Sequence, residues 1–252
     1  MLPEWDFAKW TDLFNGRDLA GWIPKIRGHE AGVDPYHTFR VEEGLLTVGY
    51  DGARDGDSYG AFGERFGHLF HERPYSSYHL RVEYRFVGAQ AEEGPDWAYR
   101  NSGVMLHAQS PGSMGVDQDF PISIEAQFLG GDSIGERPTA NLCTPGTHVE
   151  IDGVLTETHC IEATSRTFRG DEWVTVDLIV RGHESIVHVV DADTVMSYER
   201  PVVGGGVVNG FDPSVKQDGS PLSGGYVALQ SESHPIQFRS IRIRELPALP
   251  PR

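Results

Sequence analysis

Hydrophobic and polar residues alternate along most of this chain with a period of two, which is typical of β-strands that have one buried and one open face. We predict strands at residues 38–48, 77–86, 103–109, 122–129, 173–181, 185–191, 225–231 and 237–244. Between these runs lie many of the 30 glycines and 16 prolines, as the turns of an antiparallel sandwich require. Helical periodicity is nearly absent, so the pattern predicts an all-β protein.

Three segments break the alternation. Residues 49–75 and 130–170 show no clear period, and residues 201–223 are rich in glycine, proline and aspartate. Irregular segments of this length inside a compact domain are either functional loops or contain short strands that the pattern does not reveal. A chain of 252 residues with 38% hydrophobic residues is long enough to bury a full core, so we expect one β-sandwich domain over residues 1–252.

The charge and hydropathy of the chain limit its partners. A formal net charge of −16 repels phosphate backbones, and no cluster of lysine and arginine opposes it, so we expect no nucleic acid partner. No run approaches the roughly 18 apolar residues of a membrane-spanning helix, so we expect no membrane partner. The first residues, MLPEWD, lack the basic and apolar segments of a signal peptide. Nothing in the pattern indicates an oligomeric state.

An acidic turn at residues 51–57, DGARDGD, raises the question of calcium, because aspartate-rich turns supply hard oxygen ligands. The turn lacks the terminal glutamate and the spacing of an EF-hand loop. A solvated acidic loop is therefore the preferred interpretation. We predict no metal site and no required cofactor, with calcium as the alternative that no motif supports.

Cys143 and Cys160 are the two cysteines of the chain. They flank a turn rich in proline and glycine, and in an oxidising compartment they can close a loop and stabilise it by roughly 3 kcal/mol. The alternative is two unrelated buried thiols. Zinc binding by His159 and Cys160 is disfavoured, because the cysteines lack the CxxC spacing of zinc sites. We expect the disulfide, and with it a periplasmic or extracellular location.

The strand at residues 122–129 carries the strongest functional signal. Ile122, Ile124, Ala126 and Phe128 point to one side, and the other side carries Ser123, Glu125, Gln127 and Leu129. Successive residues on one side of a strand lie about 6.5–7 Å apart, so Glu125 and Gln127 can touch one sugar ring. A carboxylate in a strand of β-formers needs a reason to be there. We interpret this face as a carbohydrate groove; the alternative for Glu125 is an ion pair with Arg100.

Other polar residues near the predicted groove are candidates for chemistry. By parity His107 lies on the open side of its strand, whereas the side of His188 is ambiguous; either imidazole can shuttle protons near neutral pH. The alternative for both is a structural histidine bonded to a backbone carbonyl. Candidate substrate contacts are Arg100, Asn101, Gln127, Gln230, Glu232 and His234. For residues 230–234 the alternative is an exposed polar turn. Four aromatic residues are candidates for stacking on sugars, although Trp22 fits the core better: Trp22, Tyr59, Trp97 and Tyr99.

Several segments resemble a known family when they are read in order. Residues 14–22 read FNGRDLAGW, residues 39–46 FRVEEGLL, residues 101–104 NSGV, residues 124–127 IEAQ, residues 225–230 GYVALQ and residues 236–243 IQFRSIRI. This series resembles the bacterial 3-keto-disaccharide hydrolase family over residues 13–246. The resemblance implies a concanavalin A-like jelly roll of the lectin and glucanase superfamily, with two curved antiparallel sheets and the ligand in the concave face.

The resemblance also implies a reaction. A ketone at C3 of a glycoside acidifies the proton on C2, so one base can start elimination of the substituent at C1, and water addition then gives net hydrolysis. We assign the base to Glu125 and the second proton to His107 or His188, with Arg100 and Asn101 as candidates to contact hydroxyls or the ketone oxygen. An ordinary double displacement is disfavoured on this strand, because the neighbour of Glu125 is Gln127, which does not ionise. An ordinary glycosidase and a non-catalytic carbohydrate-binding module remain the alternatives.

Overall fold

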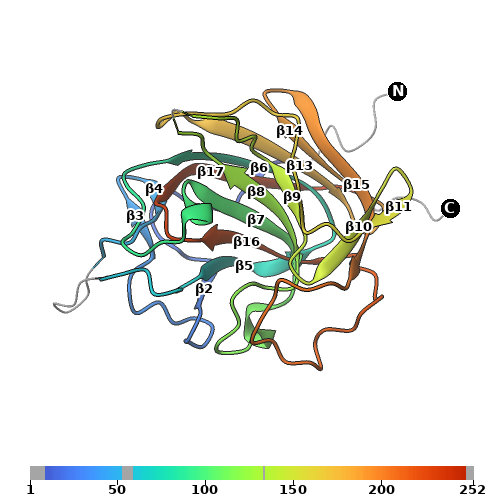
Figure 1. Ribbon diagram of the computed structural model, residues 1–252, viewed down its shortest axis with the longest axis horizontal. Coiled ribbons are helices and arrows are strands. Elements are labelled where there is room, and N and C mark those ends of the chain that lie inside the picture. Colours follow the sequence, from blue (N-terminus) through green and yellow to red (C-terminus); the bar gives the residue numbers. More distant parts are fainter. Residues whose placement is uncertain (1–8, 53–58, 133, 248–252) are drawn as a thin grey trace.

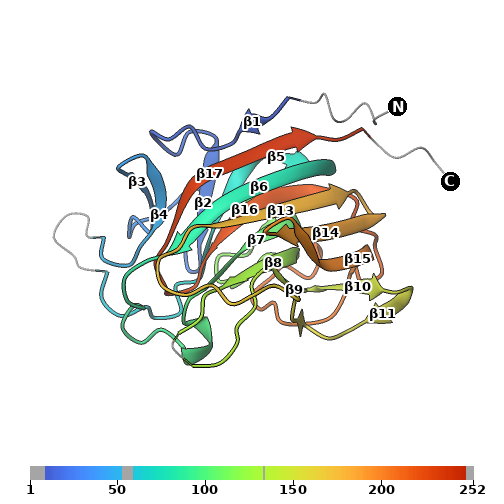
Figure 2. The same ribbon diagram turned by 90° about the horizontal axis from the view of Figure 1, so that it is seen from above.

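The computed structural model describes residues 9–52, 59–132 and 134–247 and consists of two curved antiparallel β-sheets, as expected (Figure 1). The first sheet has ten strands in the order β11-β10-β15-β14-β13-β6-β17-β4-β3, with β1 beside β17. The second has seven strands in the order β12-β9-β8-β7-β16-β5-β2. Figure 2 shows the two layers from above. The all-β prediction is thereby confirmed.

Seventeen strands and two short 3-10 turns make up the described structure. The ten-stranded sheet contains β1 (Thr11–Asp12), β3 (Phe39–Glu42), β4 (Leu45–Val48), β6 (Ser77–Phe86), β10 (Thr147–Ile151), β11 (Val154–Thr156), β13 (Val174–Arg181), β14 (Ser185–Val190), β15 (Asp193–Val203) and β17 (Ile236–Glu245). The seven-stranded sheet contains β2 (Trp22–Ile26), β5 (Gly67–Tyr75), β7 (Asn101–Ala108), β8 (Ile124–Leu129), β9 (Asn141–Cys143), β12 (Cys160–Ile161) and β16 (Gly225–Ser231). Two short 3-10 turns, η2 (Asp96–Ala98) and η3 (Pro111–Ser113), precede and follow β7.

The main core lies between the two sheets. On β6 every second residue is buried, and the intervening residues reach the outside. On β8 Ile124, Ala126 and Phe128 join the same core. The ring of Phe128 stacks on Tyr84 of β6 with centroids 4.2 Å apart. Alternation thus turns one face of each sheet inward, which leaves the other face of the seven-stranded sheet for a site; we call this second face the open face.

Several predicted boundaries differ from the observed ones. The run 38–48 is a hairpin of β3 and β4, which turns at Glu43 and Gly44 with positive φ angles of 50° and 82°. The irregular segments contain β5 and β9 to β12. β5 begins with five consecutive buried residues and therefore shows no alternation, whereas β9 and β12 have only three and two residues. No helix in the described part of the chain is long and apolar enough to cross a membrane.

Candidate functional site

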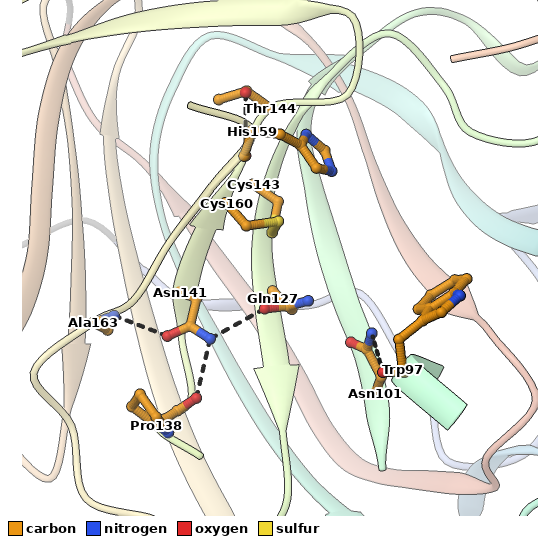
Figure 3. The surroundings of a disulfide bond; sticks show 10 residues. All are labelled: Trp97, Asn101, Gln127, Pro138, Asn141, Cys143, Thr144, His159, Cys160 and Ala163. Atoms are coloured by element: carbon orange, nitrogen blue, oxygen red, sulfur yellow. Dashed lines mark hydrogen bonds between the residues drawn. A yellow bond between two sulfur atoms is a disulfide. The ribbon is translucent and has the colours of Figure 1, made fainter. Parts of the chain in front are cut away.

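A cavity of about 350 Å³ opens on the open face of the seven-stranded sheet. Residues from β7, β8, β9, β12 and the loops above them line it: Trp97, Asn101, Phe120, Glu125, Gln127, Cys143, Pro145, His159, Cys160, Val207 and Glu232. Figure 3 shows one wall of this cavity. The cavity is of a size typical for small-molecule sites.

Glu125 and Gln127 lie side by side on the cavity floor, on the side of β8 that its alternation predicts. The amide oxygen of Gln127 accepts a hydrogen bond from Asn141 Nδ2 at 3.1 Å (Figure 3). Asn141 also donates to the carbonyl of Pro138 and accepts from the backbone N–H of Ala163. This network fixes the Gln127 carboxamide, and its NH₂ group is left to face a ligand.

Glu232 brings a second carboxyl group to the cavity. It follows the last residue of β16, which pairs with β7, the neighbour of β8. Gly103 lies on β7, between β16 and β8. A Cβ atom added to Gly103 at ideal geometry would lie 2.6 Å from Glu125 Oε1. The absence of a side chain at Gly103 therefore provides the space for the Glu125 carboxyl group. We predicted Glu232 as a substrate contact, but alternation along one strand does not reveal its proximity to Glu125.

The two carboxyl groups hold protons more tightly than exposed glutamates do. Glu125 is 6% exposed and Glu232 is 4% exposed. Burial raises the pKa of Glu125. Burial, together with the negative charge of Glu125, raises the pKa of Glu232 well above its usual range. Because two adjacent buried carboxylates repel each other, loss of the proton from one group disfavours its loss from the other. Such a pair can supply an acid and a base.

The rim of the cavity is apolar and aromatic. Trp97, in η2, is 53% exposed, and its ring stacks on Phe66 with centroids 5.9 Å apart. Val207 is 50% exposed at the same cavity. A large exposed ring held in place beside polar groups suits the apolar face of a sugar. The other aromatic candidates serve packing: Trp22 and Tyr59 lie in the core, and Tyr99 packs on His234.

The disulfide between Cys143 and Cys160 forms, as predicted, and it builds part of the cavity wall. The cysteines face each other on the paired strands β9 and β12, and Cys143 is also the register partner of Glu125 on β8. The ligand atoms of Cys143, His159 and Cys160 lie within 4.8 Å of one another. Both sulfurs belong to the disulfide and are not the thiolates that zinc binds. Of the predicted acidic turn at residues 51–57, residues 53–57 lie outside the described residues, and its first residue, Asp51, forms an ion pair with Arg40 at 2.6 Å.

His107 does not face the cavity, contrary to our expectation. A β-bulge places Leu106 and His107 of β7 opposite the single residue Val227 of β16, and His107 has a positive φ of 50°. The extra residue reverses the parity, so the His107 ring lies edge-on to Tyr78 of β6. His107 Nε2 is 2.9 Å from the carbonyl oxygen of Gly182. The histidine therefore belongs to the interior of the sandwich.

His188 also lies in the interior and is not a candidate for the second proton. It shares the buried side of β14 with Ile186 and Val190. Nδ1 lies 2.8 Å from the carbonyl oxygen of Ala140, and Nε2 lies 2.8 Å from the hydroxyl of Tyr198. Burial lowers the pKa of His188 to about 4, so the ring stays neutral at physiological pH. Its apolar strand neighbours were the sequence signal for this location.

The remaining predicted contacts divide into two groups. Asn101 lines the cavity, whereas Arg100 turns away and donates to the carbonyl of Gly170. His234 is buried against Phe86 and Tyr99 rather than beside Glu125. Gln230 is fully buried on the same side of β16 as Glu232, just beyond the cavity lining. Phe120, Pro145 and Val207 were missed, because they come from loops with no pattern.

Comparisons with solved structures support the fold. Two predicted glycosyl hydrolases of Parabacteroides distasonis are similar: one at 18% identity over 98% of each chain with a TM-score of 0.58, the other at 15% identity over 94% of this chain and 100% of its own with a TM-score of 0.54. The Bacillus licheniformis beta-glucanase covers 95% of this chain and 98% of its own at 9% identity, with a TM-score of 0.50. These likenesses confirm the concanavalin A-like jelly roll.

Sequence comparisons give the family. A comparison with curated protein sequences found no match. The model of the 3-keto-alpha-glucoside-1,2-lyase-like domain matches residues 9–244, nearly the whole chain and close to the predicted region. The chain therefore belongs to the 3-keto-alpha-glucoside-1,2-lyase-like domain family, a family of carbohydrate-active proteins.

Proposed function

We propose that this protein cleaves 3-keto-glycosides or 3-keto-disaccharides by elimination, followed by hydration of the product to give net hydrolysis. The observation that carries the proposal is the buried pair of carboxyl groups, Glu125 and Glu232, on the floor of a cavity with an exposed tryptophan at its rim. Membership of the 3-keto-alpha-glucoside-1,2-lyase-like domain family supports this choice of substrate class. Neither histidine that we first assigned to the second proton is needed, because Glu232 takes that role.

The proposed reaction uses one glutamate as base and the other as acid. Ionised Glu125 accepts the proton from C2 of the oxidised ring, and the electrons of that C–H bond form a double bond between C1 and C2. The bond from C1 to the glycosidic oxygen breaks, and protonated Glu232 gives its proton to the leaving oxygen. Addition of water across the double bond returns a proton to C2 and places a hydroxyl group on C1. The raised pKa of Glu125 makes its carboxylate a stronger base, and the raised pKa of Glu232 keeps the acid protonated near neutral pH.

Other cavity residues are proposed to bind the sugar. Trp97 offers its face to the ring, and the NH₂ group of Gln127 is oriented for a hydroxyl. Asn101 has a buried amide oxygen that accepts no hydrogen bond from the described residues. These three side chains surround the glutamate pair on the same cavity.

An ordinary glycosidase is the second candidate, and the second carboxyl group favours it. A retaining glycosidase needs two carboxyl groups about 5–5.5 Å apart, and the sequence offered only one on the strand. Glu232 supplies the other. A binding module without catalysis fits less well, because burying two carboxyl groups side by side costs stability that sugar binding alone does not require.

We propose that the protein acts outside the cytoplasm, in the periplasm or the extracellular space. The Cys143–Cys160 disulfide supports this, because such bonds persist in oxidising compartments. The proposed partner is the carbohydrate substrate.

The test is turnover of 3-keto-glucosides and of their unoxidised parents by the same enzyme preparation. We expect release of the leaving group from the oxidised compounds only. In Glu125→Gln, which keeps the side-chain volume and removes the base, turnover falls by about 10²–10⁴-fold, the usual contribution of a general base, while ligand affinity changes little. Equal cleavage of the unoxidised parents contradicts the elimination mechanism and favours an ordinary glycosidase.

A further inference from the structure

A row of polar side chains crosses the open face beneath the cavity. Gln230 of β16 pairs in register with His68 of β5, and His68 pairs with Lys25 of β2. β7 pairs with the other edge of β16. Leu229 pairs with Val104 there, so the residue of β7 beside Gln230 is Gly103. Since Gly103 is also the residue over which the Glu125 carboxyl group lies, the row connects the glutamate pair with His68.

Gln230 and His68 are buried and lack hydrogen-bond partners in the part of the chain that the structure describes. Both side chains are 0% exposed. Among the described residues, neither the two polar atoms of the Gln230 carboxamide nor the two ring nitrogens of His68 have a partner. A buried polar group without a partner costs about 1–3 kcal/mol. Two adjacent side chains that carry such a cost indicate a role in binding rather than in folding.

The chemistry of the pair is that of neutral donors. Burial and the positive charge of Lys25 lower the pKa of His68 to about 3, so the ring carries one N–H and no charge at physiological pH. Gln230 adds the N–H groups of its amide. The Lys25 ammonium group donates to the carbonyl oxygens of Ile26 and Val116, and it places a fixed positive charge beside His68.

The proposed elimination needs donors of this kind. As the proton leaves C2, negative charge develops on the C3 oxygen, and an enzyme must stabilise that oxygen. Of our two expected contacts for hydroxyls or this oxygen, Arg100 is occupied by Gly170 and Asp171, whereas Asn101 lines the cavity. We propose that Gln230 and His68 form a two-donor site for the C3 ketone oxygen of the oxidised sugar. This inference rests on the proposed function and deepens it, because it assigns the group that distinguishes a ketone from a hydroxyl.

Phe120 separates His68 from the cavity. Its ring is edge-on to His68 with centroids 6.0 Å apart, and the same side chain lines the cavity. Phe120 is only partly buried. The proposed contact requires Phe120 to turn away from His68, so that the sugar ring takes the place of the phenyl ring over the sheet.

The test uses His68→Phe and Gln230→Met, which keep the approximate shape and remove the donors. Because the removed atoms have no protein partners among the described residues, we expect the Tm of each variant to stay at the wild-type value or to rise. We expect kcat for a 3-keto-glucoside to fall by about 10²-fold, as for the loss of one donor to a developing oxyanion. His71→Phe is the matched control on the same strand. Its Nδ1 accepts from the Arg73 backbone N–H and lies 3.1 Å from the Tyr75 hydroxyl, so its Tm falls and its kcat does not.

The outcomes separate this inference from the proposed function. If the wild-type enzyme does not act on 3-keto-glucosides, the proposed function fails. If the wild type acts on them and His68→Phe retains full kcat, the proposed function stands and the donor site is wrong. A marked loss of Tm in both donor variants also overturns the inference, because it shows that the two side chains stabilise the folded protein.

Discussion

His188 and His68 are both histidines at 0% exposure, yet they lie in regions of the molecule that use polar groups in opposite ways. Between the sheets, both ring nitrogens of His188 lie at hydrogen-bonding distance from protein oxygens. On the open face, both ring nitrogens of His68 lack partners among the described residues. Burial lowers the pKa of each, to about 4 and about 3. Burial and pKa alone therefore do not distinguish these two histidines, whereas their hydrogen-bond partners do.

The largest expected effect lies in the interior. His188→Phe leaves the Ala140 carbonyl and the Tyr198 hydroxyl without their partner, and each unsatisfied group costs about 1–3 kcal/mol. We expect the free energy of unfolding to fall by about 2–6 kcal/mol, measured by urea denaturation, with little change in the kcat of the folded fraction. If His188→Phe is as stable as His68→Phe, the two regions do not differ in how far their histidines stabilise the fold.

The disulfide gives the next effect, on stability. It closes a loop with a sequence separation of 17, so its reduction removes roughly 3 kcal/mol on the loop-entropy model. We expect Tm to fall by several degrees in a thermal melt with reductant. The variant with Cys143→Ser and Cys160→Ser is the control, because its Tm must not respond to reductant. Alkylation of both thiols in the unreduced folded protein contradicts the assignment.

The carboxyl pair predicts a pH-dependent cost in stability. Because the pKa of Glu232 is raised in the folded state, the folded protein retains a proton that the unfolded chain releases above about pH 4.5. Stability is therefore lost as the pH rises. We expect Glu232→Gln to raise Tm by a few degrees at pH 8 and by less at pH 5, while activity falls. A Tm gain that is independent of pH shows that the carboxyl group is not the cause.

Adding a single methyl group at Gly103 tests the position of Glu125. In Gly103→Ala the new methyl group meets Glu125 Oε1 at 2.6 Å and the Ala126 carbonyl oxygen at 3.1 Å, so the flexible Glu125 side chain must move aside and the backbone must shift slightly. We expect about 10²-fold lower turnover, as a displacement of about 1 Å can cause, with a change in Tm of only a few degrees. Gly112→Ala is the control, because its Cβ meets no atom within 4 Å. If Gly103→Ala keeps wild-type turnover, the reaction does not depend on the exact position of the Glu125 carboxyl group.

Alternation predicted much of the fold. The predicted strands 77–86 and 225–231 coincide with Ser77–Phe86 and Gly225–Ser231. The side of β8 that carries Glu125 was also correct. Period-two reasoning works there because each strand has one face in the core and one outside it. It failed for β9 and β12, which are too short to show a period.

The site was less predictable, for two physical reasons. One extra residue in β7 reversed the side of His107, and a bulge of this kind has no reliable sequence signal. The proximity of Glu232 to Glu125 depends on the order of strands β8, β7 and β16 in the sheet. Strand order is a property of the tertiary structure, so a single strand read alone showed only Gln127 beside the base.

The measurement that tests the elimination mechanism most directly is incorporation of deuterium at C2 during turnover of a 3-keto-glucoside in D₂O, followed by NMR. Elimination by Glu125 and subsequent hydration predict one deuteron at C2 of the 3-keto sugar that is released. The released sugar incubated with Glu125→Gln is the control for spontaneous exchange. A product that retains its original C2 proton while the leaving group is released contradicts the mechanism and assigns the glutamate pair to direct hydrolysis.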